Sequence, residues 1–136
     1  MEEKIHRIRQ PLDDALDFTV RVIQEDHMEA DLPLRGLAVN SLGRAHGGAI
    51  VSTADALMAN LSGPPSDDRG TQRAVTVALQ VHFIRAARGA SVRFEAQLLH
   101  SGRRLSFTEC KVYDQSGKLV AQISGSYARL EGEGGS

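Results

Sequence analysis

One apolar segment, residues 49–61, constrains the fold more than any other part of the chain. Its apolar residues recur at helical spacing around almost the whole circumference, and Asp55 is its only charged residue. A helix that is apolar on nearly all sides is usually buried, so the rest of the chain must surround it. The segment Ser62-Gly-Pro-Pro65 follows directly and predicts the end of this helix.

The surrounding elements are predicted to be strands. Apolar and polar residues alternate with period two over six segments: 18–23, 28–34, 75–83, 92–98, 103–113 and 118–130. The first two segments predict a hairpin, and the closely spaced glycine turns among the later ones predict an antiparallel meander. We therefore expect an α+β fold, with an antiparallel sheet of five or six strands wrapped around one central helix.

A chain of 136 residues fits one domain with a modest core. We expect that domain to span residues 1–130, with residues 1–16 as an irregular N-terminal extension. The glycine-rich segment 131–136 is predicted to be a disordered tail. Because a single open sheet leaves unpaired edges, pairing with a second copy of the chain is expected as well.

Composition excludes several classes of protein. The net charge is −1 and no basic block stands out, so we expect no nucleic-acid partner. No apolar run approaches the roughly 20 residues of a membrane span, and the charged N-terminal region does not resemble a signal peptide. The five histidines are scattered, which predicts no metal site. Cys110 is the single cysteine; it reads as a small core residue of a cytoplasmic protein.

The start of the apolar helix is a candidate binding site. Gly47 and Gly48 precede it, so backbone N–H groups there lack helical partners and carry the positive end of the helix dipole. The absence of two side chains lets a ligand approach the backbone. Such a junction suits a carbonyl oxygen that becomes an oxyanion, although a glycine pair before a helix also occurs as simple packing.

Asp55 lies seven residues after Gly48, close to two helical turns, so both face the same side of the helix about 10 Å apart. A substrate could lie along the small residues between them, with its carbonyl at the junction and its reacting carbon nearer the carboxylate. Taken singly, Asn40 is a turn residue, and His46 is either a structural loop residue or a group that polarises a carbonyl.

Together these residues form a motif. The segment Asn40-Ser-Leu-Gly-Arg-Ala-His46-Gly-Gly, followed by Asp55, resembles the signature of hotdog-fold acyl-CoA thioesterases, and it is most similar to the phenylacetyl-CoA thioesterase branch. The similarity extends over residues 17–130 and includes the strands expected at 75–85 and 120–129. It implies a curved sheet around the helix and a homodimer joined edge to edge, with the sites at the interface; a homotetramer is a further possibility.

The resemblance also implies roles for individual residues. Asp55 is the general base or nucleophile that cleaves the thioester, and the Gly48 amide is the oxyanion hole, with Gly47 beside the substrate. Asn40 orients water or the thioester, and His46 supports the loop. Thr76 is expected to reach the site from the partner subunit, although a plain strand threonine is an equal alternative. No cofactor is implied, since coenzyme A is part of the substrate.

Positive charge is needed for the phosphates of CoA. By analogy, Arg103 and Arg104 are the first candidates to bind them, and Arg85 and Arg88 are the second. The chain departs from the family pattern at Arg44, where a small residue is usual. It also departs at residues 86–87, where a proline is usual, and in a longer loop at 62–73.

Two other functions fit a chain of this fold. A hydratase or dehydratase acts on enoyl-CoA esters, but its usual motifs differ from the one found here. A non-catalytic acyl-CoA-binding protein would not need both Asp55 and Asn40.

Overall fold

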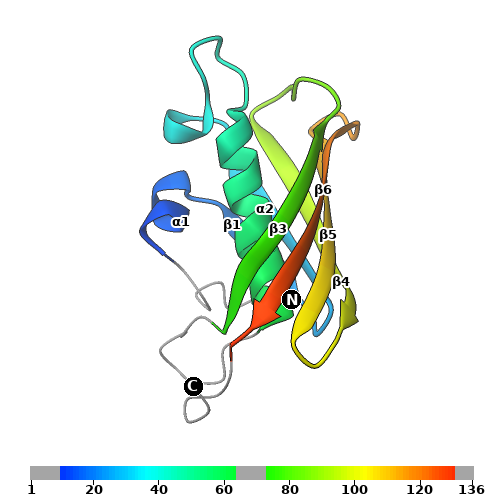
Figure 1. Ribbon diagram of the computed structural model, residues 1–136. Helices are drawn as coiled ribbons and strands as arrows, with labels where there is room; N and C mark the ends of the chain where they lie inside the picture. The colour runs from blue at the N-terminus through cyan, green and yellow to red at the C-terminus, as the bar shows by residue number, and fades with distance from the viewer. Residues whose placement is uncertain (1–9, 64–72, 131–136) are drawn as a thin grey trace.

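The computed structural model describes residues 10–63 and 73–130, and it consists of one long helix against one curved sheet (Figure 1). The elements in chain order are α1 (Pro11–Leu16), β1 (Thr19–Ile23), β2 (His27–Pro33), η1 (Gly36–Ala38), α2 (Gly47–Ser62), β3 (Ala74–Phe83), β4 (Ser91–Ser101), β5 (Leu105–Asp114) and β6 (Leu119–Arg129). This architecture confirms the expected α+β fold, with six strands in the sheet. Each predicted strand is present, with ends shifted by a few residues.

The strands run in the order β1-β2-β4-β5-β6-β3, and all neighbours are antiparallel. The prediction of a meander is right for β4, β5 and β6 and wrong for β3, which pairs with β6 instead of β4. The reason is that α2 connects β2 to β3 and crosses the concave side of the sheet on the way. The chain therefore re-enters the sheet at its far edge, and β2 occupies the position beside β4.

Helix α2 has one buried face and one open stripe. Leu57, Met58 and Ala54 are buried against the sheet, and burying each of the two larger side chains is worth about 1.5–3 kcal/mol. The positions of this stripe recur at three- and four-residue spacing: Gly48 is exposed, and the partly exposed residues are Val51, Ser52, Asp55, Ala56 and Ala59. Asp55 and Gly48 thus lie on the same open stripe, as the helical spacing predicts.

The segment expected to be irregular, residues 1–16, contains a helix: α1 begins at Pro11. Proline suits the first helical position, where no intrahelical N–H bond is lost. The Gln10 amide donates to the Asp13 carboxylate at 3.1 Å as part of a capping box, and the left-handed Asp17 ends the helix. Helix α1 packs against α2 (Figure 1). The predicted tail, 131–136, lies outside the described residues.

Arg129, the last residue of β6, joins the C-terminal end of α2 to the turn between β4 and β5. Its guanidinium donates to the Ser62 carbonyl at 3.2 and 3.3 Å and to the Gly102 carbonyl at 3.2 Å. It also donates to the hydroxyls of Ser101 and Ser106. A cation at the C-terminal end of a helix is favoured by the helix dipole, so this contact stabilises α2 in place.

Candidate active site

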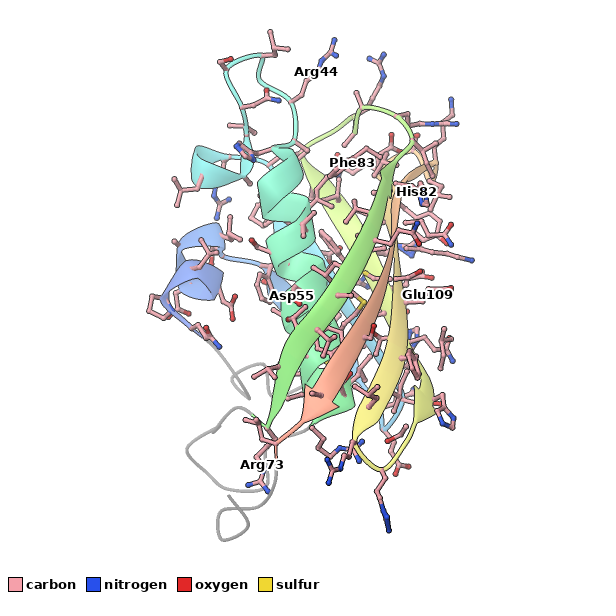
Figure 2. All side chains as sticks on the ribbon, viewed as in Figure 1. Arg44, Asp55, Arg73, His82, Phe83 and Glu109 are labelled. Carbon is pink, nitrogen blue, oxygen red and sulfur yellow. The ribbon has the colours of Figure 1, made fainter. Side chains whose placement is uncertain are left out.

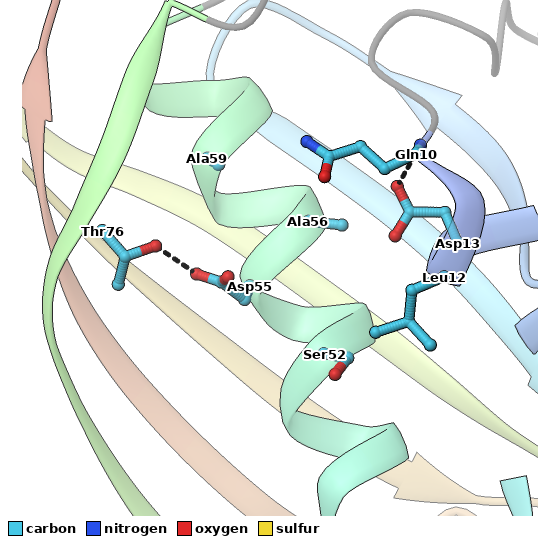
Figure 3. A pocket seen from close by; sticks show the side chains of 8 residues that line it. All are labelled: Gln10, Leu12, Asp13, Ser52, Asp55, Ala56, Ala59 and Thr76. Atoms are coloured by element: carbon cyan, nitrogen blue, oxygen red, sulfur yellow. Dashed lines mark hydrogen bonds between the residues drawn. The ribbon is translucent and has the colours of Figure 1, made fainter.

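A cavity of about 200 Å³ opens beside Asp55, between α1, α2 and β3 (Figure 3). Helix α2 contributes small side chains, Ser52, Ala56 and Ala59, together with Asp55. The remaining lining residues are Gln10, Leu12 and Asp13 of the α1 region and Thr76 of β3. The open stripe of α2 therefore faces a space bounded by elements on both sides, and the carboxylate of Asp55 lies at its β3 side.

Two hydroxyl groups hold the Asp55 carboxylate. Thr76 Oγ1 donates to Asp55 Oδ1 at 2.8 Å, and Tyr127 Oη donates to the same oxygen at 2.7 Å. Within the described residues, Oδ2 receives no hydrogen bond. One carboxylate oxygen is therefore engaged by the protein, and the other is available to a ligand.

Tyr127 is the residue that the sequence motif did not identify. It comes from β6, is 0% exposed, and lies on the inner face of the sheet opposite Thr76 in register. Burial is the main cause that raises the pKa of Tyr127 far above its ordinary value, and the negative charge of Asp55 raises it further. The hydroxyl therefore stays protonated and donates a hydrogen bond to Asp55. The available signal was a tyrosine at an inward position of a strand, since a buried phenol needs a hydrogen-bond partner.

Thr76 reaches Asp55 of its own chain. The sequence resemblance suggested instead that this side chain serves the site of the partner subunit. Strand β3 is an edge of the sheet, and Thr76 is an exposed residue on it, so this wall of the cavity is also the rim of the molecule.

At the start of α2, His46 is the N-cap residue. Its Nδ1 accepts a hydrogen bond from the Gly48 amide at 2.9 Å, which requires a neutral ring with its proton on Nε2. The amide assigned to the oxyanion hole is thus bonded within the chain. The Phe83 ring covers the neighbouring glycine: a Cβ on Gly47 would lie 3.2 Å from Phe83 Cζ.

Asn40 shapes the loop that leads to this junction. Its Oδ1 accepts hydrogen bonds from the amides of Leu42 and Arg44, both at 3.0 Å. Gly43 adopts a φ of +74°, a conformation that favours glycine. The structure therefore gives Asn40 a local turn role, and no contact joins it to Asp55 within the described residues.

The candidate phosphate-binding arginines lie at opposite ends of α2. Arg85 follows β3 at the Phe83 end, near the start of α2. Arg44, which was noted only as a departure from the family pattern, lies at the same end (Figure 2). Arg103 and Arg104 lie in the turn that Arg129 ties to the end of α2, about 24 Å away along a 16-residue helix. None of the four forms an ion pair with a carboxylate of the described residues.

Within residues 10–63 and 73–130, no three histidine, cysteine, aspartate or glutamate side chains gather in a way that would hold a metal ion. Over the same ranges, no helix has the length and apolar character needed to cross a membrane. Cys110 is fully buried in β5, and burial raises the pKa of its thiol, as expected of a core residue.

The family model described as "Thioesterase superfamily" matches residues 42–121, which contain Gly48 and Asp55. A curated relative, the 1,4-dihydroxy-2-naphthoyl-CoA hydrolase of Escherichia coli (strain K12), is 29% identical over 104 residues. The alignment covers 76% of this chain and 75% of the relative.

Solved structures share the fold. A conserved protein of Pseudomonas aeruginosa superposes with a TM-score of 0.78 at 28% identity, covering 94% of this chain and 100% of that one. A Bacillus halodurans protein solved with CoA superposes with a TM-score of 0.77 at 27% identity, covering 93% and 83%. The six-stranded sheet with one central helix is thus the hotdog fold of thioesterase structures.

Proposed function

The chain belongs to the thioesterase superfamily and is a thioester hydrolase, and on that premise we propose that it cleaves an acyl-CoA to a carboxylic acid and CoA. The observation that carries the proposal is the position of Asp55. Its carboxylate lies on the open stripe of α2, beside a cavity, with Oδ1 held by two hydroxyls and Oδ2 available. The two hydrogen bonds to Oδ1 therefore hold the free oxygen, Oδ2, in a fixed position beside the cavity.

Asp55 acts as a general base or as a nucleophile. As a base, Oδ2 takes a proton from water while the water oxygen bonds to the thioester carbon. The C–S bond then breaks, and the CoA thiolate takes up the proton. As a nucleophile, Oδ2 bonds to the carbon and expels the thiolate, and water then cleaves the resulting anhydride. Well-placed general-base catalysis contributes about 10²–10⁴-fold to a rate.

The Gly48 amide is proposed to receive the thioester oxygen. Because that amide donates to His46 Nδ1 in the free chain, substrate binding requires the imidazole to turn away or to share the donor. The helix dipole then acts on the developing oxyanion. His46 thereby holds the junction in shape until the substrate takes its place, and Asn40 preserves the loop that carries it.

The cavity is proposed to bind the acyl group. Its volume of about 200 Å³ is below the roughly 300–1,000 Å³ of sites that enclose a whole drug-sized ligand, so most of CoA lies outside it. Both the branch that the motif resembles and the E. coli relative are named for aromatic acyl-CoA esters. We therefore place aromatic acyl-CoA esters first among the substrates to test.

A homodimer joined along β3 is proposed, with a tetramer as a further step. Strand β3 is a sheet edge and exposes Val75, Val77 and Phe83. Antiparallel pairing of two β3 edges would bring the end of one protomer that carries Arg103 and Arg104 alongside the Gly47 end of the other. The phosphates of CoA would then meet arginines of both protomers. A cytoplasmic setting stays a prediction from the single cysteine.

Free-thiol release from aromatic, short-, medium- and long-chain acyl-CoA esters tests the function, on the wild type and on Asp55→Asn. We expect CoA release by the wild type and a loss of at least 100-fold, the lower bound of about 10²–10⁴-fold for a lost general base, in the variant. Near-normal turnover by Asp55→Asn would remove Asp55 from the mechanism. Incubation with an enoyl-CoA tests the hydratase alternative: loss of its conjugated absorbance without thiol release would favour a hydratase. Tight binding of an acyl-CoA without turnover would favour a binding protein.

A further inference from the structure

The Asp55 carboxylate is held asymmetrically. Both hydrogen bonds that it receives from the described residues end on Oδ1, one from Thr76 and one from Tyr127. A donated hydrogen bond occupies a lone pair and makes that oxygen a weaker base. The proton-accepting capacity of the group is therefore concentrated on Oδ2.

The two donors differ in how firmly they are held. Thr76 is an exposed residue on an edge strand, and its hydroxyl turns about one bond. Tyr127 is fully buried, and its hydroxyl sits at the end of a rigid ring. The firmer anchor of Asp55 is thus the tyrosine.

A glycine makes room for this ring. Gly125 lies two residues before Tyr127, on the same face of β6, and a Cβ on Gly125 would lie 2.8 Å from Tyr127 Cε1. It would also lie 3.1 Å from Leu79 Cδ2 and 3.2 Å from Thr108 Oγ1. Packing on several sides therefore fixes the direction in which the tyrosine hydroxyl points.

The tyrosine does not exchange its proton during the reaction. Its pKa is raised far above the ordinary value by burial and then by the charge of Asp55, so the phenol stays protonated at any working pH. Its role is therefore limited to donating a hydrogen bond.

We propose that Tyr127 is a positioning residue, which orients Asp55 so that Oδ2, and not Oδ1, faces the thioester. This inference rests on the proposed function of Asp55. It assigns a distinct task to each carboxylate oxygen and adds to the site a residue that lies 72 positions from Asp55 in the chain.

The test compares Tyr127→Phe with the wild type in the thiol-release assay. Phenylalanine keeps the ring and removes only the hydroxyl. We expect kcat to fall about 10- to 100-fold, the range for loss of a hydrogen bond to a charged group, with KM unchanged. Because Thr76 donates to the same oxygen, adding Thr76→Val should lower kcat by more than the product of the two single effects.

The matched control is Tyr113→Phe, since Tyr113 is the only other tyrosine. Its ring packs under the Arg93 guanidinium at 4.8 Å, away from Asp55, so kcat should not change. A second measurement needs no turnover. With ¹³Cζ-labelled tyrosine the protein gives two resonances, and Asp55→Asn should shift the Tyr127 resonance and leave that of Tyr113 in place.

The outcomes separate this inference from the proposed function. If the wild type releases CoA, Asp55→Asn does not, and Tyr127→Phe keeps the wild-type kcat, the positioning role is overturned and the function stands. A rise in KM without a fall in kcat would also overturn it. If no ester is cleaved, the proposed function fails, and an unmoved Tyr127 resonance in Asp55→Asn would overturn the inference on its own. Should Tyr127→Phe fail to fold, the same resonance still decides.

Discussion

The imidazole of His46 accepts a hydrogen bond from the Gly48 amide, 2.9 Å away, across the first turn of α2. In the free chain one histidine thus occupies the donor that the proposed reaction needs. This contact is local, because the two residues are only two positions apart in the sequence. It gives the junction both a structural and a functional role.

His46→Ala should lower the free energy of unfolding by about 1 kcal/mol, because the helix loses its N-cap. His46→Asn should lose less, since an asparagine oxygen also caps helices well. Urea denaturation followed by circular dichroism measures both values. Equal stability of His46→Ala and the wild type would show that the cap contributes nothing.

Gly125→Ala should disturb both stability and catalysis. The added methyl would lie 2.8 Å from the Tyr127 ring, and overpacking of this kind costs about 1–3 kcal/mol. We expect a lower melting temperature, and a lower kcat even though the tyrosine hydroxyl is retained. Gly117→Ala is a useful comparison, because a Cβ there meets no atom within 4 Å and only the left-handed backbone is strained. It should lose stability and keep kcat.

Val77→Lys should dissociate the proposed dimer. Val77 is 58% exposed on the β3 edge. A lysine there would place one positive charge from each protomer where the two β3 strands pair. Sedimentation velocity of the variant should show monomers at concentrations where the wild type is dimeric. Leu37→Lys, at a similarly exposed position in η1, serves as the control and should remain a dimer. A Val77→Lys dimer would place the interface elsewhere.

Asp114 should contribute to stability in a pH-dependent way. The Ser116 hydroxyl, at 2.6 Å, is the main cause that lowers the pKa of Asp114 to about 2, and backbone amides lower it further. Because this is below the ordinary value of 3.8, the stabilising contribution is complete above about pH 4 and is lost as the pH falls through about 2. Asp114→Asn should be less stable than the wild type at pH 7, and the difference should shrink towards pH 2. A difference that is constant over urea titrations at pH 7, 4 and 2.5 would contradict this.

Cys110 should not react with thiol reagents in the folded protein. Its side chain is fully buried, and burial raises the pKa of the thiol, so little thiolate forms near neutral pH. Incubation with Ellman's reagent should give no colour until denaturant is added, and then one thiol per chain. Rapid reaction without denaturant would mean that β5 opens readily.

Most of the secondary structure could be predicted from the sequence because each strand alternates clearly and α2 is apolar almost all round. The order of the strands could not, since the pairing of β3 with β6 depends on where α2 crosses the sheet. Residues 1–16 were predicted to be irregular, yet α1 begins at Pro11, because a proline suits the first turn of a helix, where no intrahelical N–H bond is lost.

The candidate site, too, could be predicted only in part. Gly48 and Asp55 share a stripe because helical spacing requires it, so geometry alone brought them together. Tyr127 was not predictable from local spacing, since its contact with Asp55 joins a helix to the last strand. The hydrogen bond between His46 and Gly48 was not predictable either, because the motif does not determine which rotamer the imidazole adopts.

The guanidinium of Arg129 has a consequence for how the domain moves. It anchors the last turn of α2 to the β4–β5 turn through several hydrogen bonds, whereas the first turn relies on a single imidazole and a short loop. We expect amide hydrogen exchange along α2 to slow steadily from Gly48 towards Leu61. Loading and unloading of the site would then be a local fluctuation at one end of the helix, with the remainder of the protein acting as a stationary frame.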